Sequence, residues 1–398
     1  MKIMNVDIKI TFWRVLFVIL MVLGVYSAYV RYFQGLGAVS NLSDQSPWGL
    51  WIGFDCLCGI MLAAGGFCVC AAVYLFNIER LHSIVRPTVL TAFLGYALFI
   101  VGLLVDLGRP WYIWHLIVYW NPHSPMFEVG WCVMLYTTIL LFEFSPNILE
   151  RFHLTWALKI VKRAMPVLIV AGVLLSTLHQ SSLGSLYLIM PSRLHPFWYT
   201  PALPFFFFGT AIAAGLAMTI FESTQSAKTF GRHLELSVLV ELGGALLVAL
   251  WVNALLRFLD YYHRDMLPKI IQPSYEAYFL WLELLLLFVI PITMLSFKKV
   301  RLSPNGLYLA SLSAILGLVT NRLNVGVTGL DTWSGHHYLP RWTELMITVS
   351  IIAFGFFLFA MAVKYLPIFE HGPGTVEPVP QPRTAIRGEI PKPSHAAT

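Results

Sequence analysis

A histidine within an apolar segment is the first group in this sequence that could do chemistry. Residues 176–185 read Ser-Thr-Leu-His-Gln-Ser-Ser-Leu-Gly-Ser, inside an apolar segment that begins near Pro166. Such a segment is long enough to span a bilayer, where a polar side chain must find its partners on other helices. Helical spacing places Ser176, His179 and Ser182 on one face, with Gln180 beside them. We therefore predict a site for the carbonyl or hydroxyl group of a small molecule. The alternative is a hydrogen-bonded network that only holds helices together.

Further ionisable residues lie toward the same half of the neighbouring apolar segments. Asp55, the pair Asp106 and Arg109, and Glu128 each fall near the outer end of a different segment. Ionisable groups at membrane depth are costly and are functional candidates by default. We predict that His179 and Asp55 contact or protonate the ligand and that Glu128 acts as a relay. The predicted binding site is completed by Gln180, Ser182, Trp51, Asp106 and Arg109.

Each of these carboxylates also has a structural interpretation. Asp55 could be an interfacial carboxylate paired with an arginine. Asp106 and Arg109 are three residues apart and could bridge each other across a helix end. Glu128 follows Ser124 and a proline, so it could simply favour the first turn of a helix through the helix dipole.

A second set of polar residues extends toward the inner side. Together with Glu128 and His179, these residues could form a discontinuous proton path from the cytoplasm; they are Tyr96, Glu143, Glu222, Glu241 and Glu283. Isolated carboxylates near the ends of segments, such as Glu143 and Glu222, are equally explained as interface charges.

The elements that must position these residues are transmembrane helices. Of the 398 residues, 58% are hydrophobic and only 12% are charged, and the mean hydropathy is +0.73. This composition predicts an all-α, polytopic membrane protein with an uncleaved first helix. The ten predicted spans cover about residues 11–31, 50–76, 86–105, 125–145, 166–190, 201–222, 236–259, 274–296, 306–321 and 342–365.

The distribution of basic residues predicts the orientation. Most of the 26 Lys and Arg residues fall on the side of the N-terminus, including a basic connector over residues 151–163. Both termini are therefore predicted to be cytoplasmic. Orientation accounts for the net charge of +6, so no nucleic-acid partner is expected. Residues 1–365 form the membrane domain, and the Pro-rich residues 366–398 form a tail predicted to be disordered.

The loops on the outer side are long and aromatic. Residues 32–49, 106–124, 191–200, 260–273 and 322–341 carry many Trp, Tyr and Pro residues. Aromatic belts at the membrane interface explain many of them. Ordered loops on one side also suit the docking of an extramembrane partner.

The sequence offers no metal or haem site. The five cysteines lie in apolar segments without the spacing of a metal-binding pair, and we interpret them as packing residues; they are Cys56, Cys58, Cys68, Cys70 and Cys132. A haem held by two histidines needs imidazoles on facing helices, and only His179 lies deep in a predicted span. We therefore predict that this chain binds neither haem nor an iron–sulfur cluster.

At these residues the sequence resembles the NrfD/polysulfide-reductase membrane-subunit family. It is most similar to the HybB-like branch, the integral membrane subunit of periplasmic nickel–iron hydrogenase complexes. The motifs that carry the resemblance are Pro47-Trp48-Gly49-Leu50-Trp51-Ile52-Gly53-Phe54-Asp55, Gly65-Gly66, Val85-Arg86-Pro87, Asp106-Leu107-Gly108-Arg109, Phe127-Glu128, His179-Gln180-Ser181-Ser182-Leu183-Gly184-Ser185 and Leu194-His195-Pro196.

The resemblance implies two four-helix bundles with flanking helices and a menaquinone or ubiquinone site near the periplasmic face. It also implies a periplasmic iron–sulfur partner, with hydrogenase small and large subunits, that exchanges electrons with the quinone pool, with proton translocation as an added possibility. Alternatives are the same role in a multihaem-cytochrome or molybdoenzyme complex, or a secondary transporter, although no convincing repeat supports the latter. No activity is expected from the chain alone.

Overall fold

The protein is helical almost throughout. The computed structural model describes residues 2–3, 6–7, 11–231 and 234–369. Outside the helices it contains two short strands, β1 (Lys2–Ile3) and β2 (Val6–Asp7). From residue 370 onward, the predicted disordered tail lies outside the described residues.

Nine helices in the described part of the chain are long and apolar enough to cross a membrane. They correspond to nine of the ten predicted spans, and some are built from several segments. Their bounds are Phe12–Gln34 (α1), Trp51–Leu75 (η1, α3, α4 and η2), Glu79–Asp106 (η3 and α5), Pro125–Arg151 (α7), Leu203–Phe230 (α9), Leu236–His263 (α10), Tyr275–Ser296 (α12, η5 and α13), Pro304–Ser334 (α15, η6 and α16) and Trp342–Tyr365 (α17).

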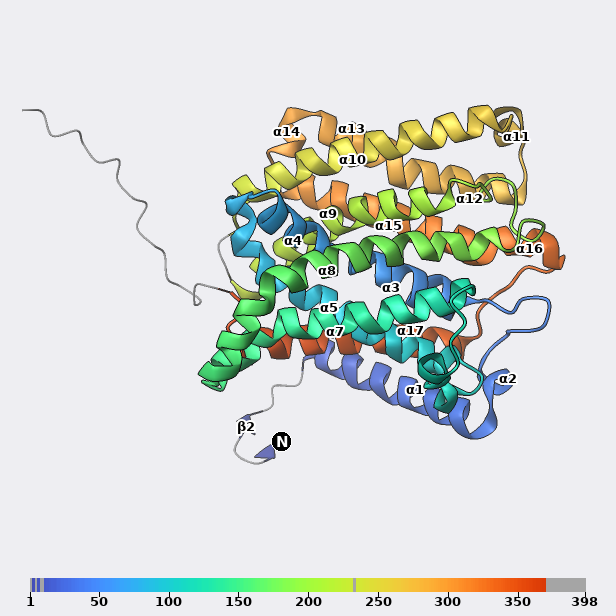
Figure 1. Ribbon diagram of the computed structural model, residues 1–398. Coiled ribbons are helices and arrows are strands. Elements are labelled where there is room, and N and C mark those ends of the chain that lie inside the picture. The colour runs from blue at the N-terminus through green and yellow to red at the C-terminus, as the bar shows by residue number, and fades with distance from the viewer. Residues whose placement is uncertain (1, 4–5, 8–10, 232–233, 370–398) are drawn as a thin grey trace, which may run out of the picture.

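The tenth predicted span falls in α8 (Thr155–Leu188), which is not one of these nine helices. This helix runs for 34 residues alongside α7 and α9 (Figure 1). The basic connector predicted over residues 151–163 is helical from Thr155 and continues into the predicted span, with Pro166 inside the helix. The polar stretch over residues 176–185 is therefore held on a long helix in the middle of the protein.

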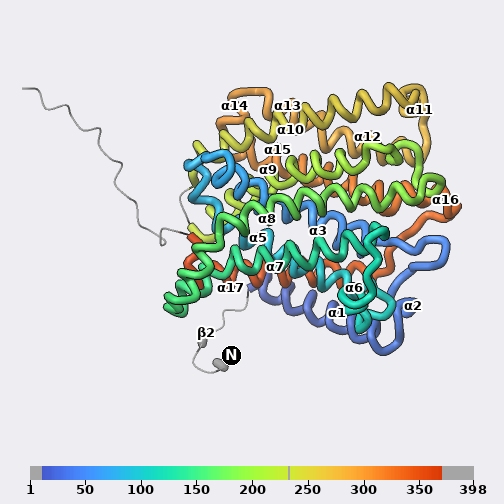
Figure 2. The backbone as a smooth tube through the Cα atoms, viewed as in Figure 1, coloured from blue at the N-terminus to red at the C-terminus, as the bar shows by residue number. Residues whose placement is uncertain are grey.

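The helices form two bundles with a flanking pair. The first bundle contains Trp51–Leu75, α5, α7 and α8, and the second contains α9, α10, Tyr275–Ser296 and α15. Contacts between α8 and α9 join the two bundles. Helices α1 and α17 pack on each other, and α17 packs on α5 (Figure 2). This arrangement confirms the predicted all-α architecture.

Short connecting elements gather at one end of the helices. Helices α2 (Leu36–Val39), α6 (His115–Val118), α11 (Leu267–Ile271) and α16 (Gly329–Ser334) lie there, whereas α14 (Lys298–Arg301) lies at the opposite end with the start of α1 (Figures 1 and 2). We call the first of these the outer end, after the predicted orientation. The predicted order of spans likewise puts the loops that contain these four short helices on one side of the membrane.

Four π-helical segments interrupt the regular helices. They are η1 (Trp51–Cys56), η2 (Ala71–Leu75), η5 (Leu285–Val289) and η6 (Asn324–Thr328). Such segments are frequent at functional sites. Segments η1 and η6 meet at two glycines, because a Cβ atom on Gly326 would lie only 3.0 Å from Cα of Gly53. The polar residues of η1 and η6 are thereby brought to the boundary between the bundles.

The cysteines pack inside the protein, as predicted. All five are free, and four of them are buried. Cys58 Sγ lies 3.3 Å from the carbonyl oxygen of Gly53, within η1.

Candidate functional site

His179 lies in a buried aromatic cluster between three helices of the first bundle. Its imidazole is fully buried on α8, and its Nδ1 lies 3.0 Å from the hydroxyl of Tyr96 on α5. The ring of Tyr96 in turn packs edge-on against Tyr136 of α7, with 4.7 Å between ring centroids. Tyr96 and Tyr136 are almost inaccessible to solvent. The sequence places Tyr96 on a proton path, and the structure makes it the direct partner of His179.

Two adjacent residues of this cluster each have a polar atom without a partner in the part of the chain that the structure describes. They are His179, at Nε2, and Gln180, at Oε1, both buried; Oγ of Ser176, one turn earlier on α8, is also buried and has no partner there. Gln180 donates its Nε2 hydrogen to the carbonyl oxygen of Ile60, 3.2 Å away on α3 (Leu57–Leu62). Buried polar groups normally find partners, so an orphaned pair is a reason to expect a ligand.

The tautomer of His179 follows from the role that Tyr96 takes. When the Tyr96 hydroxyl donates to Nδ1, Nε2 carries the hydrogen and can donate it to a carbonyl oxygen. When Nδ1 carries the hydrogen, Nε2 can accept from a hydroxyl group. Nε2 can therefore form a hydrogen bond with a ligand in its oxidised carbonyl form and in its reduced hydroxyl form. Ser182 offers less to a bound ligand, because its hydroxyl already donates a hydrogen bond to the backbone carbonyl of His179 at 3.2 Å.

Asp55 lies on a different side of the first bundle. Its Oδ2 accepts a hydrogen bond of 2.7 Å from Thr348 on α17, and its exposure is only 6%. Gly102 on α5 makes room for it, because a Cβ atom there would lie 2.9 Å from Cβ of Asp55. Six residues separate Tyr96 from Gly102, a rise of roughly 9 Å and a rotation of about 120° around α5. Asp55 and His179 thus approach α5 at different heights and on different faces.

The outer end of α5 is held by Arg31, which lies at the outer end of the first predicted span and within α1. Arg31 is buried and donates from Nε to the carbonyl oxygen of Val105 at 2.6 Å and from Nη2 to that of Leu107 at 2.5 Å. It also interacts electrostatically with Asp106. Within the described residues Asp106 and Arg109 form no ion pair, and Arg109 is exposed. Trp51 is buried near Val105, and its Nε1 has no partner among the described residues.

The predicted proton-path carboxylates are dispersed. Glu128 is half-buried in the first turn of α7, and Glu143 lies against Gly172 of α8. Glu222 is half-buried on α9, whereas Glu241 is exposed and pairs with Arg80 at 2.8 Å. No hydrogen bond joins any two of these four side chains in the described chain.

Glu283 is the centre of a second buried cluster. Its carboxylate accepts four hydrogen bonds, of 2.6 Å from Arg257, 2.8 Å from Asn321, 2.9 Å from Trp198 and 2.8 Å from Asn324. Four donors saturate the acceptor sites of a carboxylate. Glu283 is thus the counter-ion of Arg257 within the second bundle.

Arg322 completes this second cluster. It is 1% exposed, and its guanidinium lies 3.7 Å over the ring of Phe207 while donating to Thr210 at 3.0 Å. The predicted location of Arg322 in an outer loop is wrong. The span predicted to end at residue 321 continues through η6 and α16 to Ser334, because the polar residues that lower its hydropathy face the buried Glu283. The run Asn321-Arg322-Leu323-Asn324 within an otherwise apolar stretch was the available signal.

His195 holds the loop after α8. Its backbone nitrogen donates to the carbonyl oxygen of Gly329 at 2.8 Å, and its Nδ1 accepts from the backbone of Phe197 at 3.2 Å. Burial lowers the pKa of this imidazole. The neutral ring suits an acceptor role that fixes the loop.

Comparison with known proteins places this architecture in a family. The model of the polysulphide reductase NrfD family matches residues 38–332. The chain belongs to this family. The match includes Asp55, Glu128 and His179 and ends within α16.

Several relatives of this NrfD-family protein align over most of their length. A protein of Nitratidesulfovibrio vulgaris is 40% identical over 89% of this chain and 93% of its own. The probable Ni/Fe-hydrogenase 2 b-type cytochrome subunit of Escherichia coli is 34% identical, over 85% of this chain and 87% of its own. The integral membrane subunit of a menaquinone reductase of N. vulgaris is 30% identical, over 91% and 92%. This NrfD-family chain is therefore a multi-pass integral membrane protein similar to subunits of redox complexes.

Proposed function

We propose that this NrfD-family chain is the quinone-reactive membrane subunit of a redox complex whose catalytic module lies on the outer side of the bacterial cytoplasmic membrane. It anchors that module and exchanges two electrons between an iron–sulfur protein of the module and menaquinone or ubiquinone in the bilayer. The similarity to the E. coli hydrogenase subunit favours a nickel–iron hydrogenase module.

The observation that carries this proposal is the half-satisfied cluster on α8. Nδ1 of His179 is held by Tyr96, while Nε2 of His179 and Oε1 of Gln180 have no partner in the described residues. A quinone carbonyl accepts a hydrogen bond and a quinol hydroxyl donates one, so these two atoms suit both forms of the ligand.

Proton chemistry gives Asp55 its place in the proposal. Reduction of a quinone takes up two protons with two electrons, which requires an acid or base near the ring and a path to water. Asp55 is a buried carboxylate in the outer half of the first bundle, and we assign the proton exchange to it. Glu128, Glu143 and Glu222 remain candidates for a cytoplasmic path.

A second relative supports an alternative module. The similarity to the membrane subunit of a menaquinone reductase extends over nearly the whole chain. This similarity favours a module other than a hydrogenase, and the alternatives are the multihaem-cytochrome and molybdoenzyme modules expected from the sequence.

Purification of the chain with its native partners tests the proposal. We expect bound quinone in the organic extract of the complex, iron–sulfur centres in the partner and quinone-dependent electron transfer by the whole complex. His179→Ala should remove the bound quinone from an assembled complex. A complex without quinone, whose electron transfer does not respond to added quinone, would refute the proposal.

A further inference from the structure

A series of four polar residues leads from Asp55 through Asp106 and Glu344 to Tyr338 at the outer surface. We call this series the ladder and each of its residues a rung. Thr348, which donates to Asp55, and Glu344 lie four residues apart on α17. Gly102, against which Asp55 packs, and Asp106 lie four residues apart on α5. Residues four apart share a helix face and differ in height by roughly 6 Å. Glu344 and Asp106 therefore lie one turn outward of Asp55 on the two helices that flank it.

Glu344 is the middle rung of this ladder. It is fully buried, and its Oε1 accepts from the backbone nitrogens of Asn41 at 2.8 Å and Arg341 at 2.9 Å. Its Oε2 accepts a hydrogen bond from the hydroxyl of Tyr338. Asp106 lies close enough to Asp55 and Glu344 for their charges to repel one another. No direct hydrogen bond joins Asp106 to either carboxylate in the described residues, so transfer along this stretch requires intervening water.

Tyr338 forms the upper rung and lines a surface pocket. Its hydroxyl also accepts from the backbone nitrogen of Leu50 at 3.1 Å. Gly49 permits this approach, because a Cβ atom there would lie 2.4 Å from the Tyr338 hydroxyl. Burial raises the pKa of the Tyr338 phenol, which therefore stays protonated.

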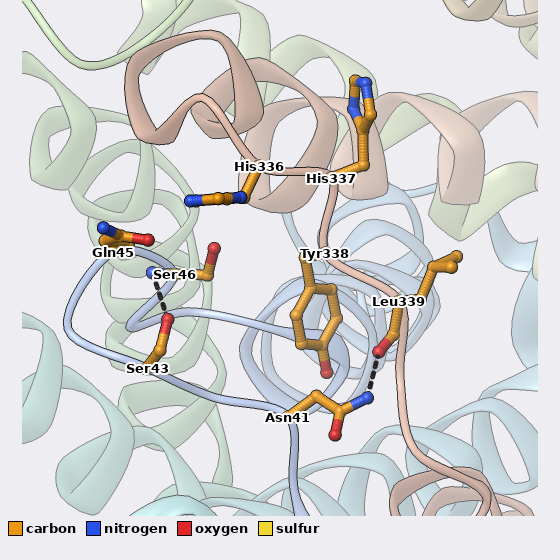
Figure 3. A pocket seen from close by; sticks show the side chains of 8 residues that line it. All are labelled: Asn41, Ser43, Gln45, Ser46, His336, His337, Tyr338 and Leu339. Atoms are coloured by element: carbon orange, nitrogen blue, oxygen red, sulfur yellow. Dashed lines mark hydrogen bonds between the residues drawn. The ribbon is translucent and has the colours of Figure 1, made fainter.

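The pocket above Tyr338 is polar and opens at the outer end. Its volume is about 250 Å³. It lies between the loop after α2 and the segment between α16 and α17 (Figure 3), and its lining residues are Asn41, Ser43, Gln45, Ser46, His336, His337, Tyr338 and Leu339. Both histidines are exposed there. Water in such a pocket can exchange protons with the Tyr338 hydroxyl.

A purely structural role does not require this set of residues. Glu344 lies at the third position of α17 and caps the helix start, a task that a glutamine performs equally well. Within the described residues Glu344 forms no ion pair. Arg31 and Arg341 direct their hydrogen bonds at backbone carbonyl oxygens. Buried carboxyl groups without a paired cation are costly, and unlike amides they can both accept and release a proton.

We propose that Asp55, Asp106, Glu344 and Tyr338 form the route by which protons pass between the Asp55 site and the outer surface. This inference rests on the proposed quinone function. For each quinone reduced, two electrons arrive from the iron–sulfur partner and two protons enter from the pocket, forming two O–H bonds; quinol oxidation reverses both flows. Gaps of about one helical turn are within reach of transfer through one water molecule.

The test uses the whole complex in proteoliposomes. A donor that cannot cross the membrane drives quinone reduction only in complexes whose module faces outward, and pH dyes outside and inside report the side of proton uptake. The variants are Glu344→Gln, which keeps both backbone contacts, and Tyr338→Phe. Glu276→Gln is the matched control, because Glu276 is also an outer-end carboxylate but accepts from Thr332 and lies off the ladder.

The proposal predicts uptake from the outside and a loss of turnover of about tenfold to a hundredfold in both variants, with bound quinone retained. Glu344→Asp should recover part of the rate. Turnover of Glu344→Gln and Tyr338→Phe at the rate of the control, or proton uptake from the lumen, would overturn the ladder while leaving the quinone function intact. Absence of quinone turnover in the unmodified complex would instead refute the proposed function.

Discussion

The hydroxyl of Tyr96 and Nδ1 of His179 are hydrogen-bonded at 3.0 Å between α5 and α8, and both side chains are fully buried. This bond orients the imidazole and leaves its Nε2 as the free nitrogen. A buried histidine oriented in this way presents one defined polar atom to a ligand at membrane depth.

Substitutions of His179 and Tyr96 should lower quinone turnover to different extents. His179→Ala should abolish quinone-coupled turnover while the complex still assembles, because the imidazole contacts the ligand. Tyr96→Phe keeps the ring but releases Nδ1, so turnover should fall by about tenfold, the equivalent of one hydrogen bond. Steady-state quinone reduction by the purified complex measures both, with Tyr26→Phe on the exposed face of α1 as the control. Normal turnover in His179→Ala would show that the site is elsewhere.

Asp55→Asn separates proton transfer from structure. The amide can still accept the hydrogen bond from Thr348 but cannot take up or release a proton. We expect slower turnover with an altered pH profile and nearly normal assembly. Thr348→Val provides the comparison, since it removes the hydrogen bond but keeps the carboxylate. Poor assembly of Asp55→Asn with a normal rate in the surviving complex would assign Asp55 a structural role.

The buried pair Arg257–Glu283 should contribute strongly to stability. Glu283→Gln removes the charge that compensates Arg257, and breaking a buried pair in this way costs about 3–5 kcal/mol. The unfolding temperature in detergent should fall markedly. Glu241→Gln is the control, because it breaks the exposed pair with Arg80, for which about 0–1 kcal/mol is expected. Equal unfolding temperatures for the two variants would contradict the assignment of a stabilising cluster.

The absence of haem stays a prediction that one assay decides. The E. coli relative is named as a b-type cytochrome subunit, whereas His179 is the one histidine of the described residues that is fully buried in a membrane helix, and its Nδ1 is engaged by Tyr96. A pyridine haemochrome assay on the chain separated from its partners should detect no stoichiometric haem. One haem per chain, lost in His179→Ala, would show that the imidazole is an axial ligand.

The sequence alone determined the architecture and the residues that merit attention. Long apolar segments must form helices in a bilayer, because no other structure satisfies their backbone within one segment. Hydropathy therefore located nine of the spans now seen. The rarity of ionisable groups within such segments singled out His179, Asp55 and Glu283.

Only the tertiary structure decided which of these residues meet. Tyr96 and His179 are 83 residues apart, and Asp55 and Thr348 are 293 apart. Such contacts depend on the rotation and relative height of packed helices, which hydropathy does not encode. The same reason explains why Arg322 was expected in a loop, why the pairing of Glu283 with Arg257 was not predicted, and why Glu344 and Tyr338 were not singled out. Their roles arise where the start of α17 meets η1 and α5, and no local pattern in the sequence marks that junction.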